Sequence, residues 1–344
     1  MLRSLWLFSF LLLAGWLPAQ FGGGTVTIDS LSSPRLDNAF GEPTTRAMSV
    51  YLPPGYATST VRYPVIYYLH GFLNDHTLTV EMIATLDEAI AAERIPPFIL
   101  VVSDSKTQVD GSFYSNSGFG NLEDYLAYDL VKHMDANYRT RPDRLSRGVT
   151  GHSMGGYGAL KLAMRHPDVF SSVYALSPGA LTVVGEYGPN SDTYRELAGI
   201  TTMDELLKSY FPKVIVAFGR AWSPNPNKPP FYADIPFAYD ADGLLVVDPA
   251  VLDKWYAEMP VHMIDAYREN LRSLTAIKLD WGRNAGDRFV RQCEMFSQRL
   301  ENAGVAHFAE EYIGTHTSDI FTPGGRVSTD MLPFFAEYLE FAAE

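Results

Sequence analysis

The chain has 344 residues, of which 47% are hydrophobic and 19% are charged, a composition that supports a large packed core and argues against disorder. Its formal net charge of −13 repels phosphate backbones and anionic membrane surfaces, so we expect neither nucleic-acid binding nor a stable membrane anchor. The sequence shows no basic run and no cysteine–histidine spacing typical of a zinc site.

The first segment has the pattern of a secretory signal peptide. Arg3 precedes an apolar run over residues 5–17, and the small residue Ala19 follows Pro18. The apolar run is shorter than the ~20 residues that a bilayer-spanning helix needs. We therefore expect cleavage after Ala19, a secreted or periplasmic protein, and a single domain over residues 20–344. No sequence feature indicates the oligomeric state.

Strand-like and helix-like segments alternate along the chain, which predicts a doubly wound, mostly parallel sheet of the α/β class. Near-continuous apolar runs are typical of strands that are buried on both faces. Helices are expected at 122–138 and 288–303, the second with the single cysteine, Cys293, as a core residue. The strands are expected at 25–28, 47–52, 64–69, 98–102, 172–176, 275–279 and 307–312.

Residues 151–155 read Gly-His-Ser-Met-Gly and match the Gly-x-Ser-x-Gly pattern of a nucleophile elbow. Strand-like residues precede this motif and a helix-like run follows it, so the pattern predicts a sharp turn that exposes Ser153. The glycines permit strained backbone angles, and the N-terminus of the following helix favours a developing negative charge. The motif therefore indicates a serine hydrolase or an acyltransferase.

An irregular insertion interrupts the alternation at about 177–248. Prolines cluster from Pro224 to Pro236, which excludes a helix or a central strand there. Long ordered insertions of this kind are usually lids or binding loops, and aromatic side chains on such loops often contact ligands. We therefore expect Trp222, Phe231 and Tyr232 to bind substrate, with a plain surface loop as the alternative.

A serine nucleophile requires a base, which in elbow enzymes follows the acid in the chain. His316 is the strongest of the eight histidines because it lies just after the last predicted strand, at the end of the sheet where Ser153 is expected. Two residues are candidates for the acid. Asp280 ends the preceding strand, and Asp287 lies in the loop that follows it, where it could equally cap the next helix.

An oxyanion hole needs two N–H donors that point at the developing alkoxide. The Met154 N–H, directly after the nucleophile, is one candidate. The other should come from the loop after the strand at 64–69, where Gly71 lets the backbone turn. We expect Phe72 to supply it, with Leu73 as the alternative.

These motifs together resemble the esterase D / antigen 85-like esterase family, from about Ala47 to the C-terminus. That family includes feruloyl and acetylxylan esterases, enterochelin esterases, S-formylglutathione hydrolases and mycolyltransferases. The resemblance implies an α/β-hydrolase fold and a triad of Ser153, Asp287 and His316, without a cofactor or metal. The chain departs from the family in two places, since Gly-Thr-His replaces the commoner Gly-Gly-His before the base and the insertion is long. The motifs that carry the resemblance are Leu69-His70-Gly71, residues 151–156, Asp280-x-Gly282, Asp287-x-Phe289 and His316.

The expected function is that of an exported serine carboxylic-ester hydrolase that acts through an acyl-enzyme. Export favours extracellular substrates, such as feruloyl or acetyl esters of polysaccharides, over the intracellular thiol adduct that S-formylglutathione hydrolases cleave. The alternatives are a mycolyltransferase-like acyltransferase, a thioesterase like the S-formylglutathione hydrolases and, less favoured, a non-catalytic binding module. No spacing of metal ligands supports a metal-dependent deacetylase.

Overall fold

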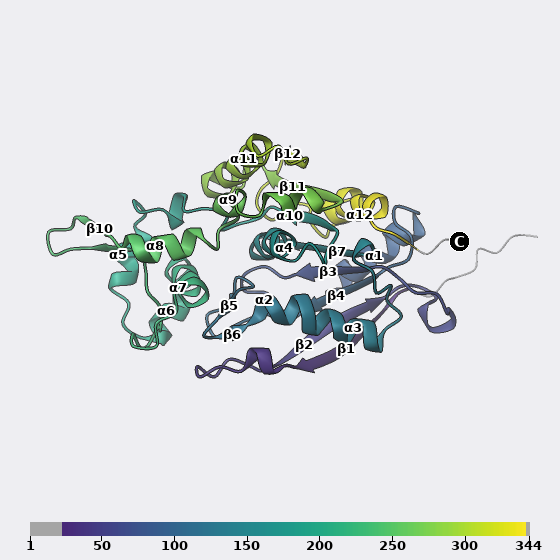
Figure 1. Cartoon of the computed structure of the whole chain (residues 1–344), viewed down its shortest axis with the longest axis horizontal. Helices are drawn as coiled ribbons and strands as arrows, with labels where there is room; N and C mark the ends of the chain where they lie inside the picture. The colour runs from purple at the N-terminus through teal and green to yellow at the C-terminus, as the bar shows by residue number, and fades with distance from the viewer. Residues whose placement is uncertain (1–22, 342–344) are drawn as a thin grey trace, which may run out of the picture.

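The computed structural model describes residues 23–341, and an eight-stranded sheet forms its centre (Figure 1). The expected leader, residues 1–19, lies outside the described residues. The strand order is β1-β2-β4-β3-β7-β8-β11-β12. β2 pairs antiparallel with β1 and with β4, and the other neighbouring pairs are parallel. The strands are β1 (Thr25–Ser32), β2 (Thr45–Leu52), β3 (Val65–Leu69), β4 (Ile99–Ser103), β7 (Arg147–His152), β8 (Ser172–Leu176), β11 (Ala276–Gly282) and β12 (Phe308–Tyr312).

Burial along the strands explains why the apolar runs predicted them. Every residue of β3 and β8 is buried, because helices cover both faces of the sheet. Tyr67 and Leu69 belong to one hydrophobic core, whereas Ile66 and Tyr68 point to the other. The edge strand β1 alternates instead between exposed and half-buried residues. The predicted mostly parallel sheet is confirmed.

Helices pack on both faces of the sheet. One core contains side chains of α1 and α12, and the other contains side chains of α3, α4, α7 and α11, including the fully buried Cys293. The expected helix at 122–138 consists of α2, a π-helical segment (Tyr125–Leu130) and α3. The helices are α1 (Val80–Ala91), α2 (Leu122–Asp124), α3 (Val131–Asn137), α4 (Met154–Arg165), α5 (Thr193–Ala198), α6 (Met203–Lys208), α7 (Tyr210–Trp222), α8 (Pro249–Tyr256), α9 (Pro260–Met263), α10 (Arg268–Ser273), α11 (Asp287–Asn302) and α12 (Leu332–Tyr338).

The insertion is more regular than the sequence predicted. It contains α5, α6, α7 and the hairpin of β9 (Phe237–Tyr239) and β10 (Leu245–Val247), and these elements gather with α8 at one end of the molecule (Figure 1). Two long stretches of the insertion lack α-helices and strands: residues 177–192, which hold one 3-10 turn, and residues 223–236, which hold one isolated bridge. Pro212 is compatible with α7 because it lies in the first turn, where a backbone N–H needs no helical partner. None of the helices within residues 23–341 is long and apolar enough to cross a membrane.

Candidate active site

Ser153 lies at the predicted strand-to-helix turn, between β7 and α4. Its φ of 60° and ψ of −115° are unusual for a residue with a side chain. Two glycines make this turn possible. A Cβ atom at Gly151 would lie 2.4 Å from the Leu69 carbonyl oxygen, and a Cβ at Gly155 would lie 1.8 Å from the same oxygen. The elbow therefore packs directly against the end of β3, where the candidate oxyanion loop begins.

His316 follows β12 and reaches Ser153, as the sequence predicted. Its Nε2 lies 2.9 Å from Ser153 Oγ. Phe289 stacks on the imidazole, with ring centroids 3.6 Å apart and an angle of 16° between the planes. His152 Nε2 donates to the His316 carbonyl oxygen at 2.8 Å. The ring and the backbone of the base are thus both held in place.

The protonation state of His316 suits a general base. Burial, with a smaller effect of the nearby Arg288 charge, lowers the pKa of His316 to about 2. The imidazole is therefore neutral at pH 7. With Nε2 accepting from the Ser153 hydroxyl, Nδ1 carries the ring proton and must donate it to another group.

Ser177 Oγ accepts this hydrogen bond. His316 Nδ1 lies 3.0 Å from Ser177 Oγ, directly after β8, where the serine has a φ of 41°. The Ser177 N–H in turn donates to Asp280 Oδ1 at 3.1 Å. Asp280 is buried and also accepts from Tyr174 and from Arg326. Asp280 therefore supports the backbone of Ser177 and makes no direct contact with the base.

The structure does not bring Asp287 to His316, so the expected contact between this acid and the base is wrong in this structure. Asp287 is the first residue of α11, its side chain is 71% exposed, and it pairs with Arg291 at 3.2 Å. Gly286, with a φ of 92°, turns the chain into α11. The helix then places Phe289, rather than Asp287, against the imidazole.

The loop after β3 presents Phe72 next to Ser153, and His70 fixes its orientation. His70 Nε2 accepts from the Ser105 N–H at 2.9 Å, so its Nδ1 is the protonated nitrogen and donates to the Gly71 carbonyl oxygen at 3.0 Å. Because C=O and N–H point in opposite directions across a trans peptide, this bond directs the Phe72 N–H away from His70. The Met154 N–H, at the first position of α4, has no acceptor within its own helix. Phe72 and Met154 both line the space beside Ser153, and their role as oxyanion donors stays a prediction.

Ser153 opens into a narrow aromatic space, the Ser153 cavity, of about 20 Å³. Tyr210, at the start of α7, is 46% exposed, whereas Phe113 is buried. The cavity is lined by Ser153, Met154, Phe72, Phe113, Gly179, Ala180, Tyr187, Tyr210, Val214 and Phe289. Its side chains are predominantly apolar, as an acyl-binding site requires.

The aromatic residues expected to bind substrate lie elsewhere. Trp222 is only 6% exposed and stacks on Phe218 at 4.4 Å, because it ends α7 instead of lying in the proline-rich loop. Phe231 is half-buried against the core, and Tyr232 packs 5.1 Å from the Phe40 ring. None of the three lines the Ser153 cavity. The expectation for Trp222 is wrong, since its burial serves packing, and the site does not include the other two.

Four site residues had no role in the sequence prediction: His70, His152, Ser177 and Phe289. Ser177 had a signal, because it directly follows the predicted strand 172–176 at the sheet end where the base was expected. A serine that bonds a distant histidine, however, leaves no pattern in the sequence that distinguishes it from other loop serines. Phe289 and His152 act by stacking and by a backbone contact, which no spacing rule reveals.

One group of side chains in the described residues has the spacing of metal ligands, Glu123, Asp124 and His166. The Glu123 carboxylate already pairs with Arg165 at 2.7 Å and with the fully buried Lys161 at 3.2 Å. Although burial alone raises it, the hydrogen bond from His166 and these two cations hold the pKa of Glu123 at about 2. We interpret the group as a buried ion network that ties α2 to α4.

Comparison with known proteins agrees with this geometry. The family model described as "Putative esterase" matches residues 41–323. The chain is 27% identical over 289 residues to the protein named Esterase Rv1288 of Mycobacterium tuberculosis, across 80% of this chain and 53% of that one. It is 35% identical over 140 residues to an endo-1,4-beta-xylanase/feruloyl esterase of Xylanibacter ruminicola, across 38% of this chain and 19% of that one. The chain thus spans about half the length of the mycobacterial relative.

A solved ferulic acid esterase has the same fold. It superimposes with a TM-score of 0.62 at 21% identity, over 92% of this chain and 99% of that one. This likeness establishes the α/β-hydrolase fold. The family match covers most of the chain and includes Ser153 and His316. The chain therefore belongs to the family described as "Putative esterase".

Proposed function

We propose that this protein is exported and hydrolyses feruloyl or acetyl esters of polysaccharides, with Ser153 as nucleophile and His316 as base. The observation that carries the catalytic part is the 2.9 Å contact between His316 Nε2 and Ser153 Oγ at a strained elbow. The N-terminal sequence supports export. The names of the Xylanibacter relative and of the solved ferulic acid esterase support the substrate class.

The reaction follows from the positions of the side chains. Ser153 Oγ attacks the ester carbonyl carbon and gives its proton to His316 Nε2. The Phe72 and Met154 N–H groups stabilise the oxyanion that forms. The carbon–oxygen bond to the alcohol breaks, and the alcohol leaves with the proton from Nε2. Water then attacks the acyl-enzyme, returns a proton to Nε2, and releases the acid as Ser153 regains its hydrogen.

The size of the Ser153 cavity bears on the acyl group. About 20 Å³ holds roughly one water molecule, so an acetyl group needs the smallest rearrangement. A feruloyl group requires a side chain to move. Tyr210 is the residue best placed for this movement, because its exposed ring can turn toward solvent without leaving a buried void.

The first experiment compares the wild type with Ser153→Ala on p-nitrophenyl acetate. Removal of the nucleophile should lower kcat by at least ~10⁴-fold, because only oxyanion binding would remain. Ser273→Ala, an exposed serine on α10, is the matched control and should keep full activity. Circular dichroism checks that the variants fold. Activity of Ser153→Ala near the wild-type level would refute the mechanism.

A further inference from the structure

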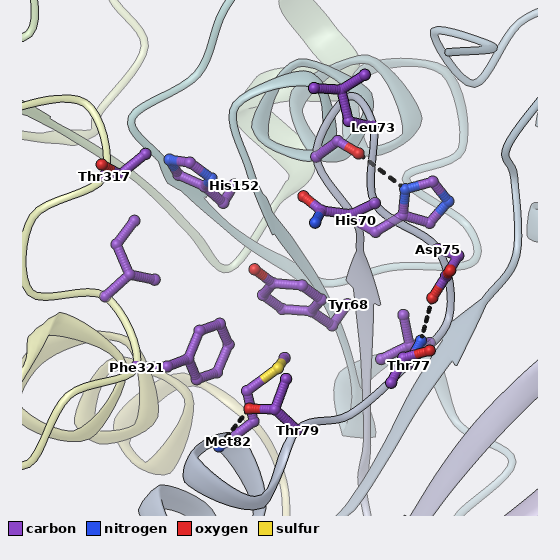
Figure 2. A pocket seen from close by; sticks show the side chains of 14 residues that line it. Tyr68, His70, Leu73, Asp75, Thr77, Thr79, Met82, His152, Thr317 and Phe321 are labelled. Atoms are coloured by element: carbon purple, nitrogen blue, oxygen red, sulfur yellow. Dashed lines mark hydrogen bonds between the residues drawn. The ribbon is translucent and has the colours of Figure 1, made fainter. Parts of the chain in front are cut away.

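A second cavity, of about 490 Å³, adjoins the candidate oxyanion loop (Figure 2). We name it the Tyr68 pocket. Gly71 and Leu73 line it, whereas Phe72, between them, lines the Ser153 cavity. His152 and Thr317 also line it, and each is the chain neighbour of a catalytic residue. The pocket is therefore built from the same three segments that form the active site.

The hydroxyl of Tyr68 is the first sign that the pocket receives a polar ligand. Tyr68 is 6% exposed, and its hydroxyl group points into the pocket, toward the side where His152 lies (Figure 2). Within residues 23–341 it has no hydrogen-bond partner, and burial is the one influence that raises its pKa. A hydroxyl that lines a pocket and makes no bond to the protein can form a hydrogen bond with a ligand that enters the pocket.

His152 supplies an acceptor to the same space. Its Nε2 donates to the His316 carbonyl, so its Nδ1 carries a lone pair. Burial lowers the pKa of His152 and keeps the ring neutral. Among the described residues, Nδ1 has no hydrogen-bond partner. The pocket thus offers an unpaired donor and an unpaired acceptor that are both uncharged.

The charges around the pocket disfavour an anionic ligand. None of the 14 lining residues is lysine or arginine. The one charged side chain is Asp75, whose pKa is lowered by hydrogen bonds from Thr77, so it stays ionised. Asp75 would repel a carboxylate or phosphate on the ligand. Lys106, which donates to the Leu73 carbonyl oxygen at 3.3 Å, is paired with Asp110 at 3.4 Å. A neutral ligand with several hydroxyl groups meets no such penalty.

The remaining wall of the pocket is apolar. Met82 of α1, Ile320 and Phe321 line it, and the Phe321 ring meets Tyr68 edge-on at 5.5 Å. An apolar wall opposite polar groups matches the two kinds of surface on a sugar ring, which carries C–H faces and hydroxyl edges. A cavity of this size is in the range of small-molecule sites.

We propose that the Tyr68 pocket binds the alcohol half of the ester, a neutral sugar residue, while the Ser153 cavity takes the acyl half. This inference rests on the proposed function. The two substituents of an ester carbonyl diverge, so a substrate whose carbonyl oxygen lies at Phe72 and Met154 must send its halves to different spaces. The two cavities share the oxyanion loop and meet this requirement.

The test compares two esters of one acid, methyl ferulate and the 5-O-feruloyl ester of methyl arabinofuranoside. Tyr68→Phe should lower the ratio of kcat/KM for the sugar ester to that for the methyl ester by roughly 3- to 10-fold, the loss expected for one hydrogen bond. Met82→Trp, which fills the pocket, should lower it further. Tyr67→Phe is the matched control, because its hydroxyl is unpaired as well but is buried, and its ring lies in the other core.

Binding of xylotriose to the Ser153→Ala protein, followed by saturation-transfer NMR, tests the pocket without catalysis. Xylotriose binding that is weaker in Met82→Trp supports the pocket. This holds even if the wild type hydrolyses neither ester, a result that would refute the proposed function. If the enzyme hydrolyses both esters, but Tyr68→Phe and Met82→Trp change neither the ratio of the two kcat/KM values nor the xylotriose affinity, the pocket proposal fails and the proposed function remains. A preference for S-formylglutathione that Tyr68→Phe reduces would also overturn it, because that ligand is anionic.

Discussion

The Ser153 cavity and the Tyr68 pocket adjoin the same loop but differ in almost every property. The first holds about 20 Å³ among aromatic rings, and the second holds about 490 Å³ with an unpaired hydroxyl, an unpaired imidazole nitrogen and a carboxylate. A small apolar space restricts the size of the group that can enter, whereas a large polar space favours ligands that form hydrogen bonds. The difference suggests that acyl groups are selected by size and alcohols by their hydroxyl groups.

The largest expected effect comes from the loop that separates the two spaces. His70→Ala removes one of the two hydrogen bonds to the Gly71 carbonyl, which also accepts from the Asn74 N–H at 3.1 Å, so the direction of the Phe72 N–H is held less firmly. We expect kcat on p-nitrophenyl acetate to fall by ~10²-fold with little change in KM, as for the loss of an oxyanion donor. His262→Ala is the control, since that ring stacks on Tyr256 outside the site. A kcat within twofold of the wild type would show that the loop holds its shape without His70.

The next effect separates Ser177 from Asp287 as the partner of the base. Ser177→Ala should lower kcat/KM by roughly tenfold, because Nδ1 loses its hydrogen bond, whereas Asp287→Asn should stay within about twofold. A loss near 10⁴-fold in Asp287→Asn, the size seen when a triad aspartate is replaced, would restore Asp287 as the acid.

The pH profile gives an independent reading of the same contact. His316 must be neutral to accept a proton, and its pKa of about 2 keeps it neutral well below pH 6.5. The kcat/KM should therefore remain flat as the pH falls from 7 to 5. A carboxylate partner would raise the pKa of His316, and kcat/KM would then fall as the pH drops below roughly 6–7. A fall of kcat/KM in that pH range would contradict Ser177 as the partner of His316.

The smallest effect concerns the size limit of the Ser153 cavity. Tyr210→Ala removes an exposed ring from its lining and should raise the ratio of kcat/KM for p-nitrophenyl butyrate over acetate by about fivefold, less than the full value of burying two methylenes. Tyr128→Ala, at a similarly exposed tyrosine that does not line the Ser153 cavity, is the control. An unchanged ratio would mean that another side chain sets the limit.

The sequence predicted the sheet and the Ser153–His316 pair because both depend on local patterns. Buried parallel strands are continuous apolar runs, and the elbow needs glycines on both sides of the serine. The order of these segments then placed His316 at the correct end of the sheet. The same rules placed Phe72 and Met154 beside Ser153, since each follows directly from the position of a turn.

The third member of the site could not be predicted, because it depends on the path of a loop. Asp287 and Ser177 both lie at the carboxyl ends of strands, and only the turn at Gly286 decides that Asp287 faces solvent. The same applies to Trp222. The prolines that follow it suggested a loop, but burial against Phe218 and Trp255 extends α7 through that residue.

The packing of Trp222 gives the protein an internal optical reporter. Its indole lies 5.5 Å from Phe113, a residue of the Ser153 cavity, and 5.6 Å from the indole of Trp255. An acyl group that displaces Phe113 must therefore alter the surroundings of both indoles and change the tryptophan emission. A sugar in the Tyr68 pocket touches none of these rings, so fluorescence and NMR would follow the two halves of the substrate separately.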